Sequence, residues 1–453
     1  MCTLTQKYNV AGPRYTSYPT VPYWDNTLFT RNQWEETLIR SFNLTNETEG
    51  ISLYIHLPFC ESLCTFCGCN KRITKNHLVE ITYIKAVLKE LGLYINLLGK
   101  KPIVKQLHLG GGTPTFFSPK HLDLLLTEVF KLTTKAKNVE FSFEGHPNNT
   151  TLEHLKIFAK HSFKRVCYGV QDYNLKVQKA INRIQPFKNV KNATDNARLT
   201  EYTSIGHDII YGLPFQTIED VEYTIKRTIE LKPDRIAFYS YAHVPWIKGN
   251  GQRGFKDQDL PTPEIKKQQY ALGKIQLEKA GYIEIGMDHF ALKTDALYKA
   301  LENNTIHRNF MGYNASKTKV MIGLGVSSIS DSWLSFAQNV KTIEAYYTLL
   351  KEDKIPVYRG HILNKEDLII RQHILNLMCH FETSWNDKNL YFKELPEVVS
   401  QLKELETDKL IKINNTSIKI TEKGKAFVRN ICLPFDLRLQ RKKPETKLFS
   451  MTV

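Results

Sequence analysis

The sequence predicts an α/β protein with three parts: a short N-terminal segment, a partial (β/α)6 barrel, and a mostly helical, winged-helix-like C-terminal domain. Two observations predict the barrel. Strand-like and helix-like segments alternate between residues 51 and 242, and repeated β–α units build parallel sheets. The alternation ends after six units, fewer than the eight of a closed barrel. A change of composition past about residue 360 predicts the third part.

The first 47 residues contain a stretch rich in aromatic residues and prolines, GPRYTSYPTVPYW (Gly12 to Trp24). Closely spaced prolines disfavour a regular helix or strand, whereas the aromatic residues favour packing against another part of the chain. We therefore expect residues 1–47 to form an irregular segment that packs on the mouth of the barrel.

The barrel is expected within residues 48–355. Its strands are rich in β-branched and aromatic residues, and its helices carry apolar residues three and four positions apart. The strands are predicted at 51–57, 104–110, 139–145, 165–170, 204–212 and 235–242. The helices between them are predicted at about 79–98, 119–131, 151–161, 189–199 and 218–231. A further helix near 264–280 and strand-like pieces at 282–286 and 319–325 follow as an extension.

The C-terminal domain is expected at residues 356–453. Helical patterns cover 366–378 and 396–406, and KLIKINNTSIKITEKG reads as a hairpin that turns at Asn414–Asn415. Helices followed by a small hairpin are typical of a winged-helix-like module.

Composition limits the partners. The 453 residues have no run of 18 apolar residues, and the N-terminus lacks the apolar core of a signal peptide, so we expect a cytoplasmic protein with no membrane partner. Its eight cysteines should then be reduced thiols or metal ligands. A net charge of +16 indicates an anionic partner, either nucleic acid or a carboxylate or phosphate substrate.

Three cysteines follow the first strand in the spacing C-x3-C-x2-C: Cys60, Cys64 and Cys67. Three thiolates can hold an iron–sulfur cluster and leave one iron open to a reacting ligand, whereas a structural zinc site needs a fourth ligand. Cys69 is too close to Cys67 to be a convenient fourth ligand. The pattern favours the open cluster over zinc. The remaining cysteines are scattered and predict packing roles: Cys2, Cys167, Cys379 and Cys432.

The second strand ends in Gly110–Gly112 and Thr113-Pro114, a turn whose bare backbone amides suit the amino or carboxylate group of a ligand. It lacks the G-x-G-x-x-G spacing of dinucleotide-binding folds. Polar residues at other strand ends should face the same barrel mouth: Glu144, Gln171, Asp172, Asp208 and His243. His56 and His108 lie in apolar strands and are expected to be core histidines with satisfied hydrogen bonds.

The cysteine loop, with Phe66 before its last cysteine, and the Gly-Gly-Gly-Thr-Pro turn resemble the radical S-adenosylmethionine (SAM) superfamily. More specific motifs resemble the family of oxygen-independent coproporphyrinogen III oxidases, and they run from about residue 7 to 432. Among them are GPRYTSYPT, CGCNK, GVQDYNLKVQKAINR, IIYGLPFQT, YSYAHVP, HRNFMGY, GLGVSSIS and RNIC.

The resemblance implies roles for individual residues. A [4Fe–4S] cluster would be held by Cys60, Cys64 and Cys67. A first SAM molecule would contact Tyr54, Gly111, Glu144 and Ile329. A second SAM molecule would contact Phe66, Gly112, Thr113, Gln171, Arg183, Asp208 and Ala242. The residues expected to serve the reaction are Tyr54, Glu144, Phe310 and Ile329.

The resemblance also implies the reaction. An electron from the cluster would cleave SAM to a 5′-deoxyadenosyl radical, which takes hydrogen from a propionate of coproporphyrinogen III. The propionate then loses CO2 and an electron and becomes a vinyl group. Two propionates would react, giving protoporphyrinogen IX in haem biosynthesis. The implied partners are this substrate and an electron donor such as flavodoxin or ferredoxin; no nucleic acid is expected, and the protein is expected to be a monomer.

Some points stay open. Arg14 and Arg308 are hypothetical ligands of the substrate carboxylates. The chain departs from the family pattern at Gly145-His146, where members carry Val-Asp, and at Met311, where they carry Gln. Three alternatives remain: a related radical SAM enzyme that methylates or opens haem, a tRNA-modifying radical enzyme, and a non-catalytic zinc-binding or haem-carrier protein.

Overall fold

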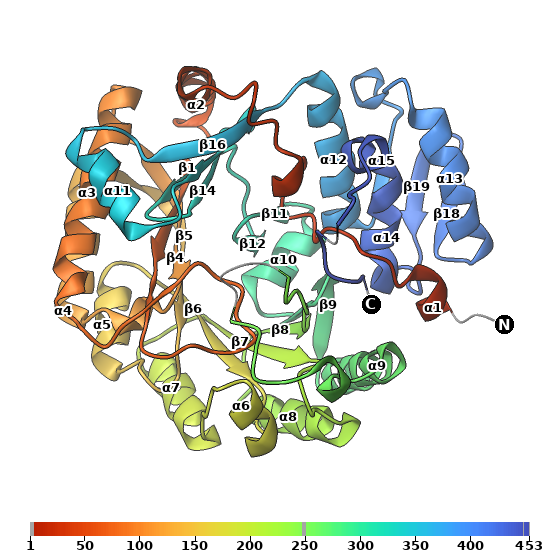
Figure 1. Ribbon diagram of the computed structural model, residues 1–453, viewed down its shortest axis with the longest axis horizontal. Coiled ribbons are helices and arrows are strands. Elements are labelled where there is room, and N and C mark those ends of the chain that lie inside the picture. The colour runs from red at the N-terminus through yellow and green to blue at the C-terminus, as the bar shows by residue number, and fades with distance from the viewer. Residues whose placement is uncertain (1–3, 247–250, 447, 453) are drawn as a thin grey trace.

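The structure, a computed structural model, describes residues 4–246, 251–446 and 448–452. Its centre is a 12-stranded sheet in the order β16-β15-β14-β13-β1-β4-β5-β6-β7-β8-β10-β9. The six predicted strands are adjacent, parallel and in chain order, which confirms the partial barrel (Figure 1). They are β1 (Ile51–Leu57), β4 (Ile103–Gly111), β5 (Thr134–Gly145), β6 (Arg165–Gln171), β7 (Ser204–Tyr211) and β8 (Arg235–Ser240).

Helices cover the outer side of these strands (Figure 1). They are α3 (Val79–Leu98), α4 (Pro119–Leu132), α5 (Leu152–Lys160), α6 (Leu175–Ala180), α7 (Phe187–Leu199) and α8 (Ile218–Glu230). The side chains of Ser118, Thr151 and Thr217 cap α4, α5 and α8 by accepting a hydrogen bond from the third helical amide. All five predicted helices are present within about two residues of their expected ends, and α6 was not predicted.

The sheet continues beyond the six strands on both sides. Strand β13 pairs parallel with β1, and three antiparallel strands extend the sheet from there. At the other edge, β10 and β9 add to β8 antiparallel, so the sheet stays open. The extension consists of β9 (Tyr282–Gly286), β10 (His289–Leu292), β13 (Val320–Leu324), β14 (Ile329–Asp331), β15 (Ser335–Asn339), β16 (Val357–Ile362), α9 (Pro263–Lys279), α10 (Ala296–Glu302) and α11 (Ile343–Lys351).

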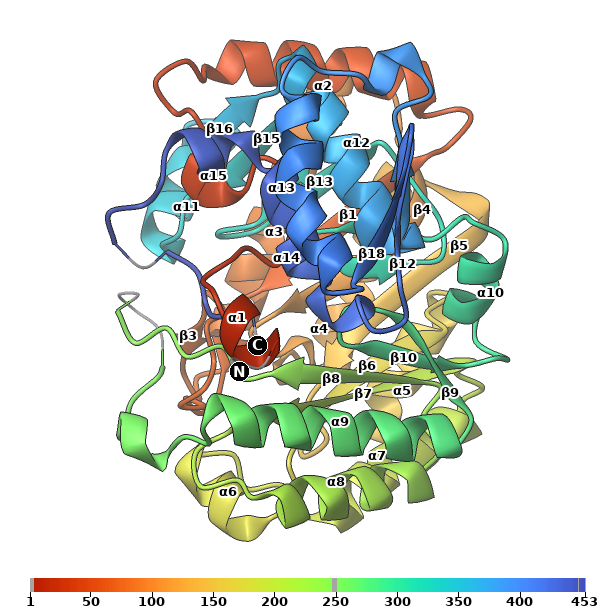
Figure 2. The same ribbon diagram turned by 90° about the vertical axis from the view of Figure 1, so that its right-hand side faces the viewer.

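The C-terminal region combines helices with the small sheet β17-β19-β18, as the winged-helix-like prediction required. In Figure 2 its helices lie above α9 of the barrel. The elements are α12 (Lys365–His380), β17 (Glu382–Ser384), α13 (Leu395–Thr407), β18 (Ile411–Asn414), β19 (Ser417–Ile420), α14 (Val428–Cys432) and α15 (Leu437–Arg441). Its apolar core includes three tyrosines from the N-terminal segment: Tyr8, Tyr15 and Tyr18.

The expectation that the N-terminal segment contains no regular element was wrong. Residues Leu4–Tyr8 form α1 and Arg31–Thr45 form α2. Thr30 and Gln33 close a capping box at the start of α2. The prolines all precede α2, and its apolar residues recur four positions apart at Trp34, Leu38 and Phe42, each fully buried.

Short elements complete the chain. The paired strands are β2 (Phe59–Cys60) with β3 (Arg72–Ile73), and β11 (His307–Asn309) with β12 (Gly312–Asn314). Single-turn 3-10 helices lie at Val21–Tyr23, Pro114–Phe116, Asp257–Asp259, Lys388–Leu390, Lys425–Phe427 and Leu433–Phe435. Among the helices of the described residues, none is both long and apolar enough to span a bilayer.

Candidate active site

The loop that follows β1 brings the three predicted cysteines to one side of the barrel mouth. Strands β2 and β3 pair at Cys60 and fix the start of the loop, and the Cys67 amide donates to the Cys64 carbonyl at 3.2 Å. All three thiols are partly exposed. The loop therefore presents its sulfur atoms toward the space above the strand ends.

Positive charge surrounds these sulfur atoms. Arg183 Nη1 lies 3.7 Å from Cys64 Sγ. A hydrogen bond from Cys69 and the charges of Lys71 and Arg183 outweigh burial and lower the pKa of Cys67 to about 6. Burial raises the pKa of Cys60 to about 11. The environment thus stabilises a thiolate at Cys67 and makes Cys60 a thiol until an electrophilic metal displaces its proton.

The donor set fits an iron–sulfur cluster. Within the described residues, no group of three or more His, Cys, Asp and Glu side chains is arranged to hold a single metal ion. A [4Fe–4S] cluster takes one cysteine on each of three irons and leaves the fourth iron open. Thiolate sulfur in a three-cysteine loop beside Arg183 and Lys71 matches a cluster with a net negative charge.

The glycine turn after β4 lies directly against the cysteine loop. The amides of Gly112 and Thr113 donate to the carbonyls of Leu57 and Phe59 at 2.9 and 3.0 Å. Gly111 has a φ of +112°, and a Cβ there would stand 2.6 Å from the His56 ring. Only glycine satisfies both conditions, so the close approach of the two loops depends on it.

Glu144, near the end of β5, accepts a hydrogen bond from the Gly111 amide at 3.3 Å. Its carboxylate also lies 3.5 Å from His108 Nε2, and half of its side chain is exposed. Burial would raise the pKa of Glu144, but the hydrogen bond and charge of His108 together with the Gly111 amide lower it. Glu144 is therefore an ionised acceptor above the strand ends.

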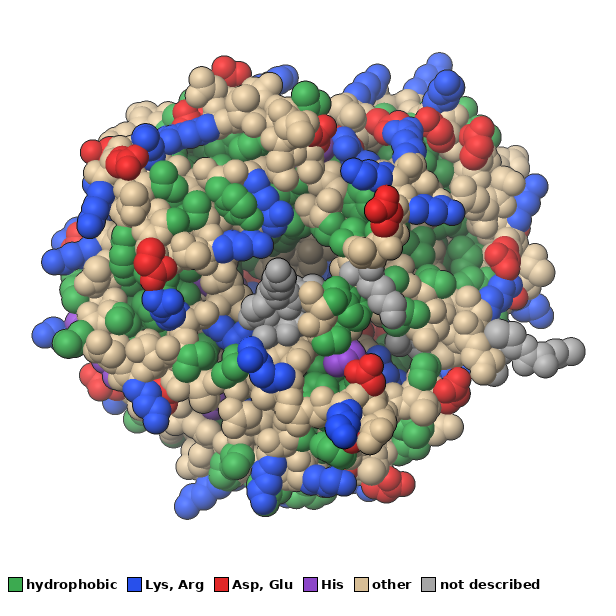
Figure 3. All heavy atoms as spheres, in the orientation of Figure 1, with side chains coloured by type: hydrophobic (Ala, Val, Ile, Leu, Met, Phe, Trp, Pro, Cys, Tyr) green, Lys and Arg blue, Asp and Glu red, His purple; other side chains and the backbone are tan. Residues whose placement is uncertain are grey.

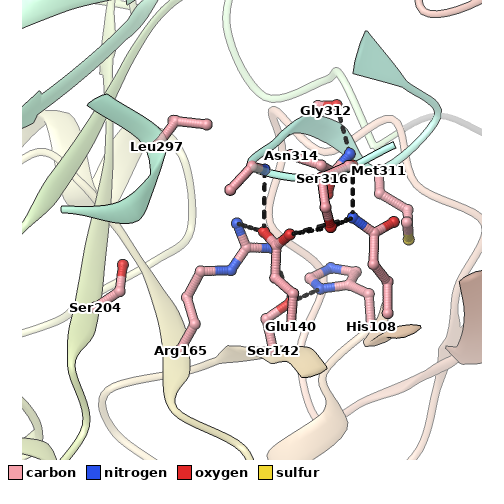
Figure 4. Close-up of polar contacts among 12 residues, drawn as sticks. His108, Glu140, Ser142, Arg165, Ser204, Leu297, Met311, Gly312, Asn314 and Ser316 are labelled. Carbon is pink, nitrogen blue, oxygen red and sulfur yellow. Dashed lines mark hydrogen bonds and ion pairs between the residues drawn. The ribbon is translucent and has the colours of Figure 1, made fainter. Parts of the chain in front are cut away.

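His108 belongs to a polar chain inside the barrel, and its largely buried ring is hydrogen-bonded, as expected. Its Nδ1 lies 2.8 Å from Ser142 Oγ, which also accepts from Arg165 Nη2 at 2.8 Å. Arg165 in turn lies 3.7 Å from Glu140 (Figure 4). The chain Arg165–Ser142–His108–Glu144 runs from the interior to the mouth. Alternation along β4 could have placed His108 on the inner face.

Tyr54, in β1, stands beside this chain. Its ring stacks on the His108 ring with centroids 6.0 Å apart, and its hydroxyl lies 3.1 Å from His56 Nδ1. His56 Nε2 lies 2.9 Å from the Asn70 carbonyl, and the side chain is buried. His56 is thus the satisfied core histidine that was expected.

A cavity of 110 Å³, here called the barrel cavity, lies inside the open barrel beneath Glu144 and Asp208. Cys167 Sγ donates to Asp208 Oδ1 at 3.1 Å, and both residues line the cavity. Burial raises the pKa of Asp208 to about 7, against the opposing hydrogen bond from Cys167. Cys167 therefore contacts a predicted site residue, whereas the sequence predicted only a packing role for it. Side chains two residues apart on a strand share a face, so the position of Cys167 relative to Arg165 could have predicted that it lies on the inner face of the barrel.

Gln171 and Arg183 approach the cysteine loop from β6 and the turn after α6. Gln171 adopts a φ of +68° at the strand end, and Arg183 Nη2 donates to the Gly169 carbonyl at 2.7 Å. Asp172 is fully buried and accepts from the Asn174 amide and from Gln216, so it holds the loop together rather than facing the mouth.

Phe66 and Ala242 are connected by a residue that the sequence did not single out. Gln252 Nε2 donates to the Ala242 carbonyl at 2.8 Å and to the Phe66 carbonyl at 3.3 Å. His243, past Ala242, lies 3.0 Å from the exposed Asp257 and does not join the other strand-end residues. The bridge of Gln252 crosses 186 residues of sequence, so no local pattern could have predicted it.

Phe310 and Ile329 lie in one small apolar cluster with Trp24 of the N-terminal segment. The rings of Trp24 and Phe310 meet edge to face, with centroids 6.4 Å apart. Next to Phe310, Met311 lines the barrel cavity from the β11–β12 hairpin (Figure 4). Trp24, Phe310 and Ile329 thus form an apolar wall next to Met311.

The face of the molecule above the barrel is hollowed at its centre, and Lys and Arg side chains lie around the hollow (Figure 3). Arg14, in the N-terminal segment, pairs with Asp288 at 2.9 Å. Arg308 is buried, donates to the Arg14 carbonyl at 3.3 Å and stacks on Tyr313 with its guanidinium carbon 4.6 Å from the ring centre.

Comparison with known proteins extends these observations. Residues 54–228 match the radical SAM superfamily. The oxygen-independent coproporphyrinogen III oxidases of Helicobacter pylori (strain J99) and Escherichia coli (strain K12) are 38% and 37% identical, and the alignments cover 96% and 97% of this chain and 96% and 95% of theirs. The solved coproporphyrinogen III oxidase of Escherichia coli, described as a radical SAM enzyme, has a TM-score of 0.86 at 34% identity, covering 93% of this chain and 97% of that one.

Proposed function

Because this chain belongs to the family of oxygen-independent coproporphyrinogen III oxidases, we propose that it converts two propionate side chains of coproporphyrinogen III to vinyl groups. The product would be protoporphyrinogen IX. The chain is a radical SAM oxidoreductase of haem biosynthesis, and its cofactors are a [4Fe–4S] cluster and SAM. The observation that carries the proposal is the juxtaposition of the three-cysteine loop, the glycine turn and Glu144 at one mouth.

Cys60, Cys64 and Cys67 are the proposed cluster ligands. The chemistry that a bound cluster supplies is the one-electron cleavage of SAM, which yields the radical that abstracts hydrogen from a propionate. Arg183 and Lys71 place positive charge beside the cysteine sulfurs and so offset the negative charge of a thiolate-bound cluster.

We assign one SAM molecule to Tyr54, Gly111, Glu144 and Ile329. Glu144 is ionised and half exposed, so it can accept from an ammonium group or a ribose hydroxyl. Tyr54 offers a ring face, and Gly111 brings bare backbone close to the ligand. These three groups meet within one patch, which the contact between Gly111 and Glu144 supports.

We assign a second SAM molecule to Phe66, Gly112, Thr113, Gln171, Arg183, Asp208 and Ala242. Arg183 suits the ligand's carboxylate, and Asp208, with a pKa of about 7, can either accept or donate a hydrogen bond near neutral pH. Gln252 supports this assignment because it fixes Phe66 and Ala242 relative to one another.

The apolar wall of Phe310, Ile329 and Trp24 is proposed to exclude water from the reacting propionate. Met311 stands where family members carry Gln. Its contact with the substrate would therefore depend on the shape of the side chain and on its polarisable sulfur atom. Gly145 leaves room for Tyr168, because a Cβ at Gly145 would stand 2.8 Å from that ring.

We further propose the division 1–47, 48–355 and 356–453. The separate apolar clusters of the barrel and the C-terminal region support the second boundary. A small electron-transfer protein such as flavodoxin or ferredoxin would supply electrons, and a monomer would suffice because every proposed site residue comes from one chain.

The test is an anaerobic assay with reconstituted protein, dithionite, SAM and coproporphyrinogen III, scored for 5′-deoxyadenosine and CO2 together. Two CO2 per substrate and a divinyl product are expected. Methylated or ring-opened haem with no CO2 would identify a related radical SAM enzyme instead. Cleavage of SAM without any change to the tetrapyrrole would overturn the substrate but retain the enzyme class.

A further inference from the structure

A second cavity, here called the junction cavity, lies where the barrel, the N-terminal segment and the C-terminal domain meet. Its volume is 330 Å³, which lies at the lower end of the range of about 300–1,000 Å³ for ligand sites. The lining comes from α1, the ends of β7 and β8, one face of α9, the β9–β10 turn and residues 423–429. None of the cofactor residues assigned above lines it.

The lining of the junction cavity combines cations with aromatic rings. Seven basic side chains border it, against two acids. The bases are Arg14, Lys266, Lys267, Lys274, Lys423, Lys425 and Arg429, and the acids are Glu284 and Asp288. Tyr211 and Tyr270 form an aromatic wall with ring centroids 5.6 Å apart. An occupant with negative charge and apolar carbon would match both features.

Part of this charge is already neutralised inside the protein. Lys274 pairs with Glu284 at 2.5 Å, and Arg14 pairs with Asp288 at 2.9 Å. Lys267 is exposed and makes no hydrogen bond or ion pair with the described residues. Among the described residues that line the cavity, basic side chains therefore outnumber acidic ones.

Three of the basic side chains, Lys266, Arg14 and Arg429, lie close enough to Asp288 and to one another to interact electrostatically. Burial and then the charges of Arg14 and Arg429 together lower the pKa of Lys266 to about 8, against the opposing charge of Asp288. Burial and then Arg14 likewise lower the pKa of Arg429 to about 10. An anion in the cavity would relieve this mutual repulsion.

Position connects the junction cavity with the active site. Tyr211 and Ser240, at the carboxyl ends of β7 and β8, line it, and that edge of the sheet carries the proposed chemistry. The Arg14 guanidinium lies 5.7 Å from the ring centre of Tyr239, which lines the barrel cavity. Arg14 and Asp288 thus stand between the two cavities.

We propose that the junction cavity holds the carboxylate arms of the tetrapyrrole that do not react. This inference rests on the proposed function, in which two of four propionates are left intact. The volume suits two carboxylate arms rather than a whole four-ring macrocycle. Lys266, Lys267 and Arg14 bind the carboxylates, and Tyr211 and Tyr270 contact the methylene carbons. The arms that react point away, toward the cysteine loop.

The test is the double variant Lys266→Met/Lys267→Met, with Lys279→Met as the matched control at the exposed end of the same helix. Holoenzyme is titrated with coproporphyrin III and with protoporphyrin IX, which both retain the unreactive pair of carboxylates. Loss of two charged contacts should weaken both ligands by roughly tenfold to hundredfold. KM for coproporphyrinogen III should rise by a similar factor, and kcat should change less than about twofold because no reacting atom is touched.

Cluster absorbance and SAM cleavage without tetrapyrrole should match the wild type, which shows that the variant is folded. Unchanged affinity for both porphyrins in a folded variant would overturn the inference and leave the proposed function intact. The same holds if Lys279→Met has an equal effect, since a general loss of charge would then explain both. A wild-type holoenzyme that neither binds nor converts the tetrapyrrole would overturn both proposals.

Discussion

The polar chain inside the barrel leads to a prediction about His108. Replacing it with Phe keeps a ring stacked on Tyr54 but removes the nitrogen that lies 3.5 Å from Glu144. The contact is long and the Glu144 carboxylate is half exposed, so its loss should cost about 1 kcal/mol, or roughly fivefold in SAM affinity.

The same variant should change the pH dependence. His108 is the main group that lowers the pKa of Glu144 against burial. Without it, the opposing effect of burial is less well compensated and the pKa of Glu144 should rise relative to the wild type. Because SAM needs the ionised carboxylate, the acid limb of SAM binding should move to higher pH.

The measurement is calorimetric titration of reconstituted, anaerobic protein with SAM across the acid range. His380→Phe makes the same side-chain change at the end of α12 and is the matched control. Ser142→Ala removes the hydroxyl that contacts His108 Nδ1 and Arg165 Nη2 but keeps the His108 ring, and it should have a smaller effect in the same direction. An unchanged SAM affinity and acid limb in His108→Phe would refute the positioning role.

The other predictions concern the cluster, SAM, the N-terminal segment and stability. Cys64→Ala should lose the iron and the visible absorbance of the reconstituted protein, whereas Cys379→Ala should keep both; a brown Cys64→Ala protein would contradict the ligand assignment. Tyr54→Ala should keep the cluster but release less methionine from SAM, and wild-type release would count against its role. Arg429→Gln removes the guanidinium that donates to the carbonyls of Gly12 and Pro13 in the N-terminal segment, so KM should rise and limited proteolysis of that segment should be faster, with iron content unchanged. If neither KM nor proteolysis increases, other contacts hold the segment. Burial raises the pKa of Glu90 from 4.5 to about 7, so between these pH values the folded chain binds more protons than the unfolded chain. The free energy of unfolding should therefore fall by about 3 kcal/mol as the pH rises from 4.5 to 7. In urea titrations Glu90→Gln should reduce this pH dependence, and a pH dependence equal to that of the wild type would contradict the assignment.

Local sequence signals predicted the elements that depend on local interactions. Helix α3 has the predicted bounds because its apolar positions repeat regularly and Gly99, with a φ of +69°, ends it. Helix α2 was missed because the prolines before it dominated the reading of the whole segment. Its capping box and apolar spacing were present in the sequence and would have predicted it.

The extension of the sheet could not be predicted in the same way. Strand β13 pairs with β1 in parallel although about 270 residues separate them, and the register depends on which edge of the sheet is free. Strands β14 to β16 are only three to six residues long, so alternation along them gives a weak signal.

The two halves of the active site differ in how they are encoded, and this explains what the sequence could predict. The cofactor side consists of short motifs at strand ends, because the cysteine sulfurs of one loop and the backbone amides of one glycine turn each lie close together in the sequence. The substrate side is assembled by distant contacts: Arg14 meets Asp288 across 274 residues, and the Arg429 guanidinium holds the carbonyl of Pro13. The charged residues on that proposed substrate side have a spacing in the sequence that shows no pattern. The net charge of +16 is spread along the sequence. The sequence therefore did not reveal that basic side chains from three parts of the chain line one cavity.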